Sequence, residues 1–533
     1  MKQLLLLISF FSSIITFAQE DAWVYFNNKP NAQYYFDNPL QMLSQRALDR
    51  RTTQNIPLDL IDIPIHQPYV AQVEAVTDIT VFAQSKWMNA VHIRGTESAI
   101  NSLSLLSFVD HVDFANHSLN TGNKAAKPVE MKVLDTQVNF NYGSSANQIQ
   151  MLNGHLLHQQ NYTGTGKIIA VLDAGFPNVN LALPFKRLRD NNQILGGYNF
   201  VGRNTNFYSG NSHGTMVLST MGGYVDNQLV GTAPDASYYL FITEDVASEN
   251  PLEESLWVEA AETADSLGVD VINTSLGYFT YDNPAYSYTY ADLNGITSFA
   301  SRGADKAFSR GMIVVVSAGN SGASANPYIS VPADAINVLA VGAVNSTEVY
   351  ASFSSIGPSF DGRVKPDVMA QGQNSVLSNT AGTITTGNGT SFSGPIMAGM
   401  IASFWQAFPS FTNTQIIQFV KQSADRFATP NAQYGYGIPD FQLALNNALS
   451  IAEFDADEFI LYPNPVKDIV TISIPENFMS STMVFYNNLG QMVLSQKINN
   501  QSQNISLESL SSGIYYYTIA SAEKTLNGKI IKN

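Results

Sequence analysis

The sequence predicts an α/β protein with a mostly parallel sheet flanked by helices, preceded by a small α/β unit and followed by a small all-β sandwich. Between residues 142 and 454, short and almost wholly apolar runs alternate with helix-like stretches, as expected for parallel strands covered on both faces. Residues 459–533 instead alternate with a period of two and carry Asn-rich turns. At 533 residues and 45% apolar content, the chain is long and apolar enough for several cores.

The first 18 residues resemble a signal peptide. Lys2 precedes an apolar run that ends at Phe17, and Thr16 and Ala18 fit the positions before a signal-peptidase cut. The run is shorter than the ~20 residues that a membrane-spanning helix needs. We therefore expect an exported chain with no transmembrane segment after the signal is removed.

The chain is acidic and has no cysteine. Its 27 Lys and Arg residues against 43 Asp and Glu residues give a net charge of −16, which makes nucleic acid and anionic lipid poor partners. The lack of cysteine excludes disulfides, thiolate metal sites and a cysteine nucleophile. Stability must then come from large apolar cores.

Three segments follow the signal. Residues 19–141 hold a first unit of alternating strand and helix patterns, ending in the small, polar linker 120–128. Residues 142–454 form the second unit, with a helix pattern at 254–268 and strand patterns at 167–175, 238–243, 269–277, 311–320 and 336–344. An acidic stretch separates this unit from the tail, 459–533, and it lacks the spacing of a calcium-binding loop.

The stretch GNGTSFSGPIMAGMIASFW, residues 387–405, surrounds Ser391 with small residues. One interpretation is a tight turn followed by a helix with Pro395 near its first position. The other is a nucleophile that a substrate must approach closely. A serine hydroxyl needs a base to act as a nucleophile, and the second unit holds only three histidines, His155, His158 and His213.

Among these histidines, His213 has the most informative surroundings. Gly214 leaves room beside it and a helix-like run follows, whereas His155 and His158 suit an ordinary helix face. No histidine follows residue 213, which excludes the α/β-hydrolase order of triad residues, and Ser393 stands where the second glycine of G-x-S-x-G belongs. His213 is therefore the candidate base.

Asp173 and Asn320 each end an apolar strand pattern, where catalytic groups gather in open α/β sheets. Asp173 could fix the tautomer of His213 and stabilise its charged form. The Asn320 amide, beside the backbone N–H of Ser391, could donate to an oxyanion. Each could alone be a turn residue, and an aspartic-protease interpretation fails because no second D-x-G copy is visible.

Taken together, VLDAG with Asp173, HGTMV with His213, SAGN with Asn320 and GTSFSGPIMAG with Ser391 resemble the motifs of the subtilases, the subtilisin-like serine proteases. The resemblance covers about residues 142–454 and implies a subtilisin-like sheet. It implies Ser391 as nucleophile, His213 as general base and acid, Asp173 as the orienting carboxylate and Asn320 as oxyanion donor.

The same resemblance implies where an extended substrate would pair. The substrate-binding residues would be Ser275, Leu276 and Gly277 on one side and Ser317, Ala318 and Gly319 on the other. Ala174 stands where the family has Ser or Thr after the aspartate, so a hydroxyl near Asp173 is missing. No cofactor is required for catalysis, and the resemblance allows structural calcium, for which the sequence shows no ligand set.

The flanking segments resemble processing and export elements. The first unit is similar to a subtilase propeptide that assists folding and blocks the cleft, with a cut between about His117 and Tyr142. The tail resembles the sorting domains of the type IX secretion system through LYPNPVKDIVTI, YNNLGQMV and LSSGIYYYTI. This implies outer-membrane secretion machinery as a partner and a Bacteroidota-like bacterium as the source. A sugar- or protein-binding sandwich is the alternative for the tail.

The predicted function is that of a secreted or surface-exposed serine endopeptidase that cleaves proteins or peptides and is inhibited by its own propeptide. The alternative is a non-catalytic adhesin or binding scaffold on a subtilase frame, against which the complete set of four site residues argues. The aromatic-rich residues 277–293 could edge the substrate channel, but a surface insertion is favoured.

Overall fold

The computed structural model describes residues 19–119, 140–454, 460–473, 481–487, 490–500, 502–520 and 525–533. They fall into two compact units. The larger, Met1–Leu445, contains the first unit of the sequence analysis and most of the second, and the smaller, Asn446–Asn533, contains the tail. The predicted signal peptide, the linker 120–128 and the acidic residues 455–458 lie outside the described residues, as does most of the segment expected to hold the propeptide cut.

A seven-stranded sheet forms the centre of the larger unit, in the order β13-β12-β11-β10-β5-β9-β6, and each neighbouring pair is parallel. The central strands are buried along their whole length, which explains their nearly all-apolar sequences. This confirms the predicted parallel α/β fold. The strands are β5 (Ile168–Asp173), β6 (Ile194–Asn199), β9 (Ser237–Ile242), β10 (Val271–Thr274), β11 (Ile313–Ser317), β12 (Leu339–Val344) and β13 (Val368–Gln371).

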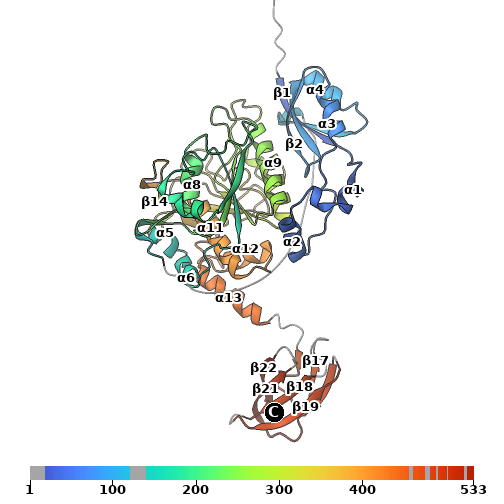
Figure 1. Cartoon of the computed structure of the whole chain (residues 1–533), viewed down its shortest axis with the longest axis vertical. Helices are drawn as coiled ribbons and strands as arrows, with labels where there is room; N and C mark the ends of the chain where they lie inside the picture. The colour runs from blue at the N-terminus through green and yellow to red at the C-terminus, as the bar shows by residue number, and fades with distance from the viewer. Residues whose placement is uncertain are drawn as a thin grey trace, which may run out of the picture. The chain divides into compact units, whose positions relative to one another are not determined.

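Helices cover both faces of this sheet (Figure 1). On one side, α11 (Thr390–Ala407) packs against β10–β13 and against α8 (His213–Gly222). On the other, α9 (Leu252–Leu267) packs against β5 and α10 (Phe299–Ser309). The predicted helix at 254–268 is thus α9, and it ends at Gly268, whose φ of 82° is the left-handed conformation that glycine adopts without a side-chain clash.

Shorter elements complete the larger unit. The helices are α5 (Ala146–Gln150), α6 (Gly154–Gln159), α7 (Lys186–Asp190), α12 (Asn413–Gln422) and α13 (Phe441–Phe454), the last of which continues past Leu445. Two hairpins pair β7 (Tyr224–Val225) with β8 (Leu229–Val230), and β14 (Ser375–Ser378) with β15 (Ile384–Gly387).

The start of α11 differs from one sequence interpretation. The helix begins at Thr390, so Pro395 lies inside it and not near its first position. A proline within a helix has no N–H for the carbonyl four residues earlier, which here is the carbonyl of Ser391. The interpretation as an ordinary proline-initiated helix is therefore wrong.

An antiparallel sheet in the order β2-β3-β1-β4 forms the first unit. Its strands are β1 (Gln19–Phe26), β2 (Ile79–Ser85), β3 (Ala90–Thr96) and β4 (Val109–Phe114); its helices are α1 (Ala32–Asp37), α2 (Gln45–Thr53), α3 (Gln67–Glu74) and α4 (Glu97–Leu103). Along β1, alternate side chains face α3 and α4, and the others face α9, which lies between β2 and the parallel sheet (Figure 1). Trp23 exemplifies the second set: its ring stacks on Phe299 at 5.1 Å and its Nε1 donates to Ser255 Oγ at 2.8 Å.

In the described parts of the tail all regular elements are strands, as predicted. One sheet has the order β16-β17-β20 and the other β19-β18-β21-β22, and the buried side chains of both form one core. The strands are β16 (Ile460–Tyr462), β17 (Ile469–Ser473), β18 (Ser481–Tyr486), β19 (Met492–Ile498), β20 (Ser502–Ser506), β21 (Gly513–Ala520) and β22 (Thr525–Lys532). The tail belongs to the second compact unit, Asn446–Asn533.

The aromatic segment 277–293 is not a surface insertion. Tyr278, Tyr281 and Tyr288 are buried, and the hydroxyls of Tyr281 and Tyr288 donate to Glu254 Oε1 at 2.7 and 2.5 Å. Glu254 is a buried residue of α9, so the tyrosine hydroxyls satisfy a carboxylate that would be costly to bury alone. The favoured sequence interpretation is wrong at this point.

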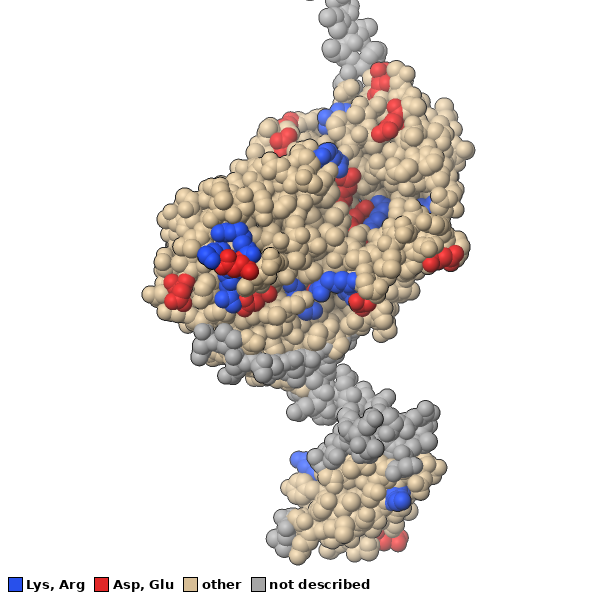
Figure 2. All heavy atoms as spheres, in the orientation of Figure 1, with Lys and Arg blue, Asp and Glu red and all other residues tan. Residues whose placement is uncertain are grey.

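Figure 2 shows the charged side chains of one face of the molecule singly or in small groups, some of which mix both signs, without a broad basic surface on that face. Within the described ranges, no helix is both long and apolar enough to cross a bilayer.

Candidate active site

Asp173 and His213 are joined by a hydrogen bond at the carboxyl edge of the parallel sheet. Asp173 is the last residue of β5 and wholly buried, and His213 is the first residue of α8. His213 Nδ1 lies 2.8 Å from Asp173 Oδ1. Because an ionised carboxylate only accepts, Nδ1 must carry the proton, which leaves Nε2 as an acceptor in the neutral ring.

Gly214 is what allows α8 to approach β5 so closely. A Cβ atom at this position would lie 2.5 Å from the Gly175 carbonyl oxygen and 2.9 Å from the Asp173 Cβ. Any side chain would push the helix, and the His213 ring with it, away from the carboxylate. The small residue after the histidine, noted in the sequence, therefore has a steric cause.

The pKa of His213 is raised above its usual value. The main cause is the negative charge of Asp173; burial opposes it, and the hydrogen bond that His213 donates to Asp173 and the nearby carboxyl group of Glu244 add to it. The ring is thus a stronger base than a free histidine.

One oxygen of Asp173 lacks a hydrogen-bond partner among the described residues. Oδ1 accepts the Ala174 N–H at 2.7 Å as well as the His213 N–H, whereas Oδ2 is buried and accepts no hydrogen bond from any described residue. A buried acceptor without a donor destabilises the fold by about 1–3 kcal/mol. The missing hydroxyl at position 174, noted in the sequence, is a direct explanation.

We expect Ala174→Ser to stabilise the protein by about 1 kcal/mol, because its hydroxyl can donate to Asp173 Oδ2. For a domain of this size the melting temperature should rise by roughly 1–2 °C. Calorimetry on a Ser391→Ala background avoids self-digestion. Ala174→Cys is matched in size but is a weak donor, so an equal rise in both variants would contradict the explanation.

The candidate nucleophile, Ser391, is fixed at the beginning of α11 by Ser275. Since Pro395 supplies no N–H, the Ser391 carbonyl is free to accept the Ser275 hydroxyl at 3.0 Å. In return, Ser391 Oγ donates to the Ser275 carbonyl at 3.3 Å. Ser275 directly follows β10, whose Thr274 pairs with the residue before Asp173, so the serine lies at the same edge as the Asp–His pair.

No hydrogen bond joins the described side chains of His213 and Ser391. The residue after Ser391 shows that the two segments are close, because the centroid of the Phe392 ring lies 6.2 Å from that of the His213 ring. The structure thus brings Asp173 and His213 into direct contact and places Ser391 at the same edge, with its hydroxyl turned toward Ser275.

Ser317 holds the same helix end from β11. Its hydroxyl donates to the Thr390 carbonyl at 2.8 Å. A Cβ on Gly394 would lie 2.9 Å from Ser317 Oγ, so the glycine in the Ser391 motif allows this close packing.

The side chain of Asn320 is oriented by Thr390. Its Oδ1 accepts the Thr390 N–H at 2.9 Å and the Thr390 hydroxyl at 3.1 Å. The Nδ2 group makes no hydrogen bond to the described residues, and Asn320 is exposed, so two N–H donors point out of this anchored amide. Sequence analysis missed the role of Thr390, for which the G-T-S motif was the available signal.

The two predicted substrate-binding segments differ in how many backbone hydrogen-bonding groups they leave available to a substrate. Leu276 is half-buried and Gly277 exposed, and their backbone groups make no backbone hydrogen bonds within the described residues. By contrast, Ser317 and Ala318 are buried, and the Gly319 N–H donates to Thr390 Oγ1 at 3.2 Å. Only the first segment therefore has both donors and acceptors available for an added strand.

Sequence analysis also missed Glu244, which lies at the same edge. The Thr243 N–H donates to the Asp173 carbonyl at 3.1 Å, and Glu244 Oε1 accepts the hydroxyls of Tyr278 and Thr243, each at 2.8 Å. Burial raises the pKa of Glu244 to about 8. Its place two residues after the apolar strand β9 is the signal that also identified Asp173 and Asn320.

The other two histidines of the second unit have structural surroundings. His158 is buried, with Nδ1 2.9 Å from the Tyr142 hydroxyl and Nε2 3.0 Å from the Thr232 carbonyl, and burial lowers its pKa to about 4. Burial also lowers the pKa of His155. Within the described parts of the chain no group of three or more His, Asp or Glu side chains could hold a metal, so the structure names no calcium ligands.

A parallel α/β sheet with aspartate, histidine and serine side chains at its carboxyl edge defines a class, the serine peptidases of α/β fold. Comparison with known proteins gives the family. Residues 132–437 match the subtilase family, residues 21–132 the peptidase S8 propeptide domain of Bacteroidota, and residues 460–533 the secretion system C-terminal sorting domain. The chain belongs to the subtilase family.

Curated relatives agree with this assignment. Subtilisin NAT of Bacillus subtilis subsp. natto is 33% identical over 300 residues, which cover 56% of this chain and 70% of that protein. Subtilisin of Bacillus pumilus is 32% identical over 300 residues, 56% of this chain and 97% of the relative. Subtilisin BL of Lederbergia lenta is 32% identical over 292 residues, which cover 54% of this chain and 93% of that protein.

The flanking matches confirm the predicted kinds of segment. The first unit is a peptidase S8 propeptide domain and the tail a secretion sorting domain, not a sugar-binding module. The sorting domain indicates export to the cell surface or the medium of a Bacteroidota-type bacterium.

Proposed function

We propose that the chain is a secreted endopeptidase that hydrolyses peptide bonds in proteins through an acyl-enzyme formed on Ser391. The hydrogen bond of 2.8 Å between His213 Nδ1 and the buried Asp173 carboxylate carries this proposal, because it leaves Nε2 as a base at the sheet edge that also holds Ser391. The boundaries of the peptidase domain, 142–454, and of the propeptide with its linker, 19–141, are part of the same proposal.

The first step is transfer of the Ser391 proton to His213. The Ser391 hydroxyl now donates to Ser275 over 3.3 Å, a long hydrogen bond, so turning the side chain toward His213 costs little. Such contacts often tighten only when substrate is bound. The oxygen then attacks the peptide carbonyl while Asp173 stabilises the charged imidazole.

Asn320 and the N–H of Ser391 stabilise the oxyanion that this attack creates. The two Thr390 bonds to Asn320 Oδ1 fix which end of the amide faces outward, so the donors are oriented before the reaction. His213 next gives its proton to the departing amine, and water, activated by the same ring, hydrolyses the acyl-enzyme.

The substrate would lie extended along Leu276 and Gly277. Their unpaired backbone groups offer hydrogen bonds to the main chain of any sequence, so binding depends little on side chains. Ser275 contributes mainly by holding Ser391, and Ser317, Ala318 and Gly319 would form the facing wall.

Labelling with a fluorophosphonate after removal of the first unit tests this function. Wild type should be labelled on Ser391 and cleave casein, and His213→Ala should lose both properties because its serine is no longer activated. A well-folded wild-type protein that neither reacts nor cleaves would favour the scaffold alternative.

The acid limb of kcat/KM against pH is expected above pH 6.5, the usual pKa of histidine. The base must be neutral, and Asp173 raises the pKa of His213, so activity is lost as pH falls through this raised value. Rates on a short peptide substrate between pH 5 and 9 measure the limb. In Asp173→Asn, the acid limb of the low remaining activity should move to lower pH. A wild-type acid limb below pH 6.5 would contradict the assignment of His213 as the base.

A further inference from the structure

Helix α2 of the first unit binds the peptidase domain at the edge opposite the candidate active site. Its arginines contact the turns that directly precede β5, β10 and β11. The carboxyl ends of β5 and β10 lead to Asp173 and Ser275. Since β5 has six residues, the two edges are roughly 20 Å apart.

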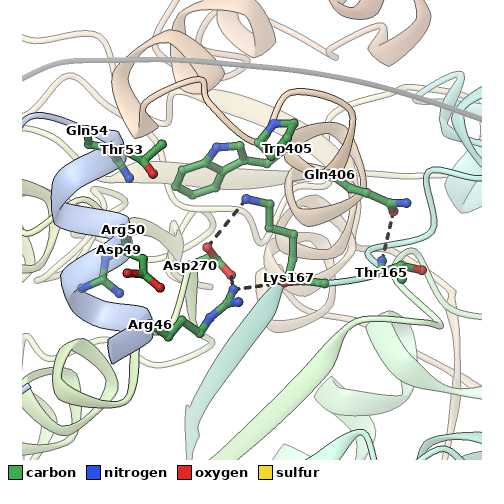
Figure 3. Close-up of a pocket in the computed structure, with 12 residues that line it drawn as sticks. Arg46, Asp49, Arg50, Thr53, Gln54, Thr165, Lys167, Asp270, Trp405 and Gln406 are labelled. Atoms are coloured by element: carbon green, nitrogen blue, oxygen red, sulfur yellow. Dashed lines mark hydrogen bonds and ion pairs between the residues drawn. The ribbon is translucent and has the colours of Figure 1, made fainter. Parts of the chain in front are cut away.

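Arg46 bridges two of these turns. Its Nε donates to the Gly268 carbonyl at 2.9 Å, and its Nη2 donates to the Gly166 carbonyl at 3.0 Å and to the carboxylate of Asp270. Figure 3 shows Arg46 extending from α2 toward Asp270, with Lys167 on the other side of that carboxylate. A cavity of about 290 Å³ remains beside α2, so the helix does not fill this edge.

Arg50 and Arg51 are both buried and meet at Asp265. Arg51 Nη2 lies 2.8 and 3.0 Å from the two carboxylate oxygens. Arg50 donates to the same carboxylate, to the Val269 carbonyl and, at 3.2 Å, to the Arg310 carbonyl. The forked guanidinium, with five donors in one plane, suits this set of acceptors, and a lysine ammonium does not.

Asp265 depends on the first unit for its charge balance. It is wholly buried in the last turn of α9, where the helix dipole disfavours a carboxylate. Burial alone would raise its pKa, but Arg51 and Arg50 outweigh burial and hold the pKa below its usual value. Its partners in the described residues, Arg50, Arg51 and, at 3.9 Å, Lys86, all belong to the first unit.

Asp270, in contrast, has partners in its own domain. It accepts the Ile168 N–H at 2.8 Å and lies 3.7 Å from Lys167 Nζ. If the first unit left, Asp265 would lose its cations and the carbonyls of Gly268 and Val269 would lose their arginine donors. The departure would thus uncover a ready-made set of oxygens for guanidinium groups.

We propose that Asp265, Asp270 and these carbonyl oxygens form a guanidinium-binding site of the peptidase domain, and that α2 stays bound there after the linker is cut. This proposal rests on the proposed function, because it requires that the peptidase cuts the linker and that its first unit is then released. The site makes the first unit an inhibitor with an anchor that does not compete with substrate. Release then requires breaking buried ion pairs as well as cutting the chain.

Retention of the first unit after processing of the full chain tests the anchor. Arg50→Met combined with Arg51→Met removes both guanidinium groups and keeps apolar stems. We expect the wild-type first unit to remain with the enzyme on size exclusion, and the doubly substituted first unit to bind the enzyme at least about 10-fold more weakly. Arg94→Met, which removes an arginine paired with Asp21 inside the first unit, should not change retention. Equal retention in wild type and double variant overturns the proposal.

A peptide of residues 44–56 keeps the test valid if the double variant does not fold. A staple between positions 45 and 49, both exposed, holds it helical, since short helices are marginal alone. Calorimetry on the peptidase domain, separated from its first unit after processing, should show saturable binding of this peptide, and at least about 10-fold weaker binding with citrulline at positions 50 and 51. Hydrolysis of a short substrate should be unaffected. Equal binding of both peptides, binding of neither, or competition with substrate overturns the proposal.

Failure of the proposed function is recognised separately. If the chain does not cut itself, a cleavage sequence for another protease placed within residues 120–139 opens the same connection. Arginine-dependent binding without self-processing would contradict the peptidase assignment and support the site. Self-processing without arginine-dependent binding would contradict the site alone.

Discussion

Replacement of Ser391 by alanine is expected to reduce kcat by about 10⁶-fold, the magnitude known for the nucleophile of subtilisin, a relative of this chain. Alanine cannot form the acyl-enzyme, and Asn320 alone can only stabilise charge. Processing of the precursor should stop together with cleavage of casein. The measurement is the single-turnover rate on a peptide ester after trypsin-like contaminants have been inhibited.

His213→Ala is the matched control for this replacement. Because nucleophile and base act as one unit, the single variants and the double variant should be about equally inactive. Multiplicative losses in the double variant would mean that His213 does not activate Ser391. Ser391→Ala with full peptidase activity would place the nucleophile elsewhere.

Asn320→Ala is expected to lower kcat by about 10²–10³-fold with little change in KM, the magnitude known for the oxyanion asparagine of subtilisin. Its side-chain donors act on charge that develops only in the transition state. Steady-state kinetics on a peptide amide measure both constants. A loss confined to KM would show that Asn320 binds substrate rather than the oxyanion.

Thr390→Val provides a second comparison for this effect. The variant keeps the backbone N–H that Asn320 accepts but removes the hydroxyl, so the amide should be less well fixed and kcat should fall by a smaller factor than in Asn320→Ala. Thr390→Ser, which retains a hydroxyl, should restore most of the activity. If valine and serine behave alike, the hydroxyl has no part in orienting Asn320.

Sequence patterns predicted the parallel sheet because its strands are buried on both faces and therefore almost wholly apolar. The same logic located Asp173 and Asn320, since a polar residue that ends such a strand must lie at the carboxyl edge. Glu244 satisfies this rule equally well but belongs to no recognised motif, so it was overlooked. The resemblance to subtilases then identified residues that position alone could not assign.

Contacts between distant segments could not be read from the sequence. The buried tyrosines of 277–293 look like an exposed insertion until Glu254, on another element, is seen to accept their hydroxyls. Arg50 and Arg51 likewise look like solvated residues of a polar helix, and their burial depends on Asp265, more than 200 positions away. In each case the partner that makes burial favourable comes from a fold that local periodicity does not encode.

The proline within α11 lowers the stability of the helix but leaves the Ser391 carbonyl free to bond with Ser275. An interior proline weakens an ordinary helix by about 3 kcal/mol, so a search for thermostable versions of this chain would select against it. Yet alanine there would return an amide to the main-chain oxygen of Ser391, and the link to Ser275 would have to compete with a regular helical bond. The longest buried helix in the described part of the chain thus has a weak first turn, and attempts to strengthen that turn would loosen the reactive group that it carries.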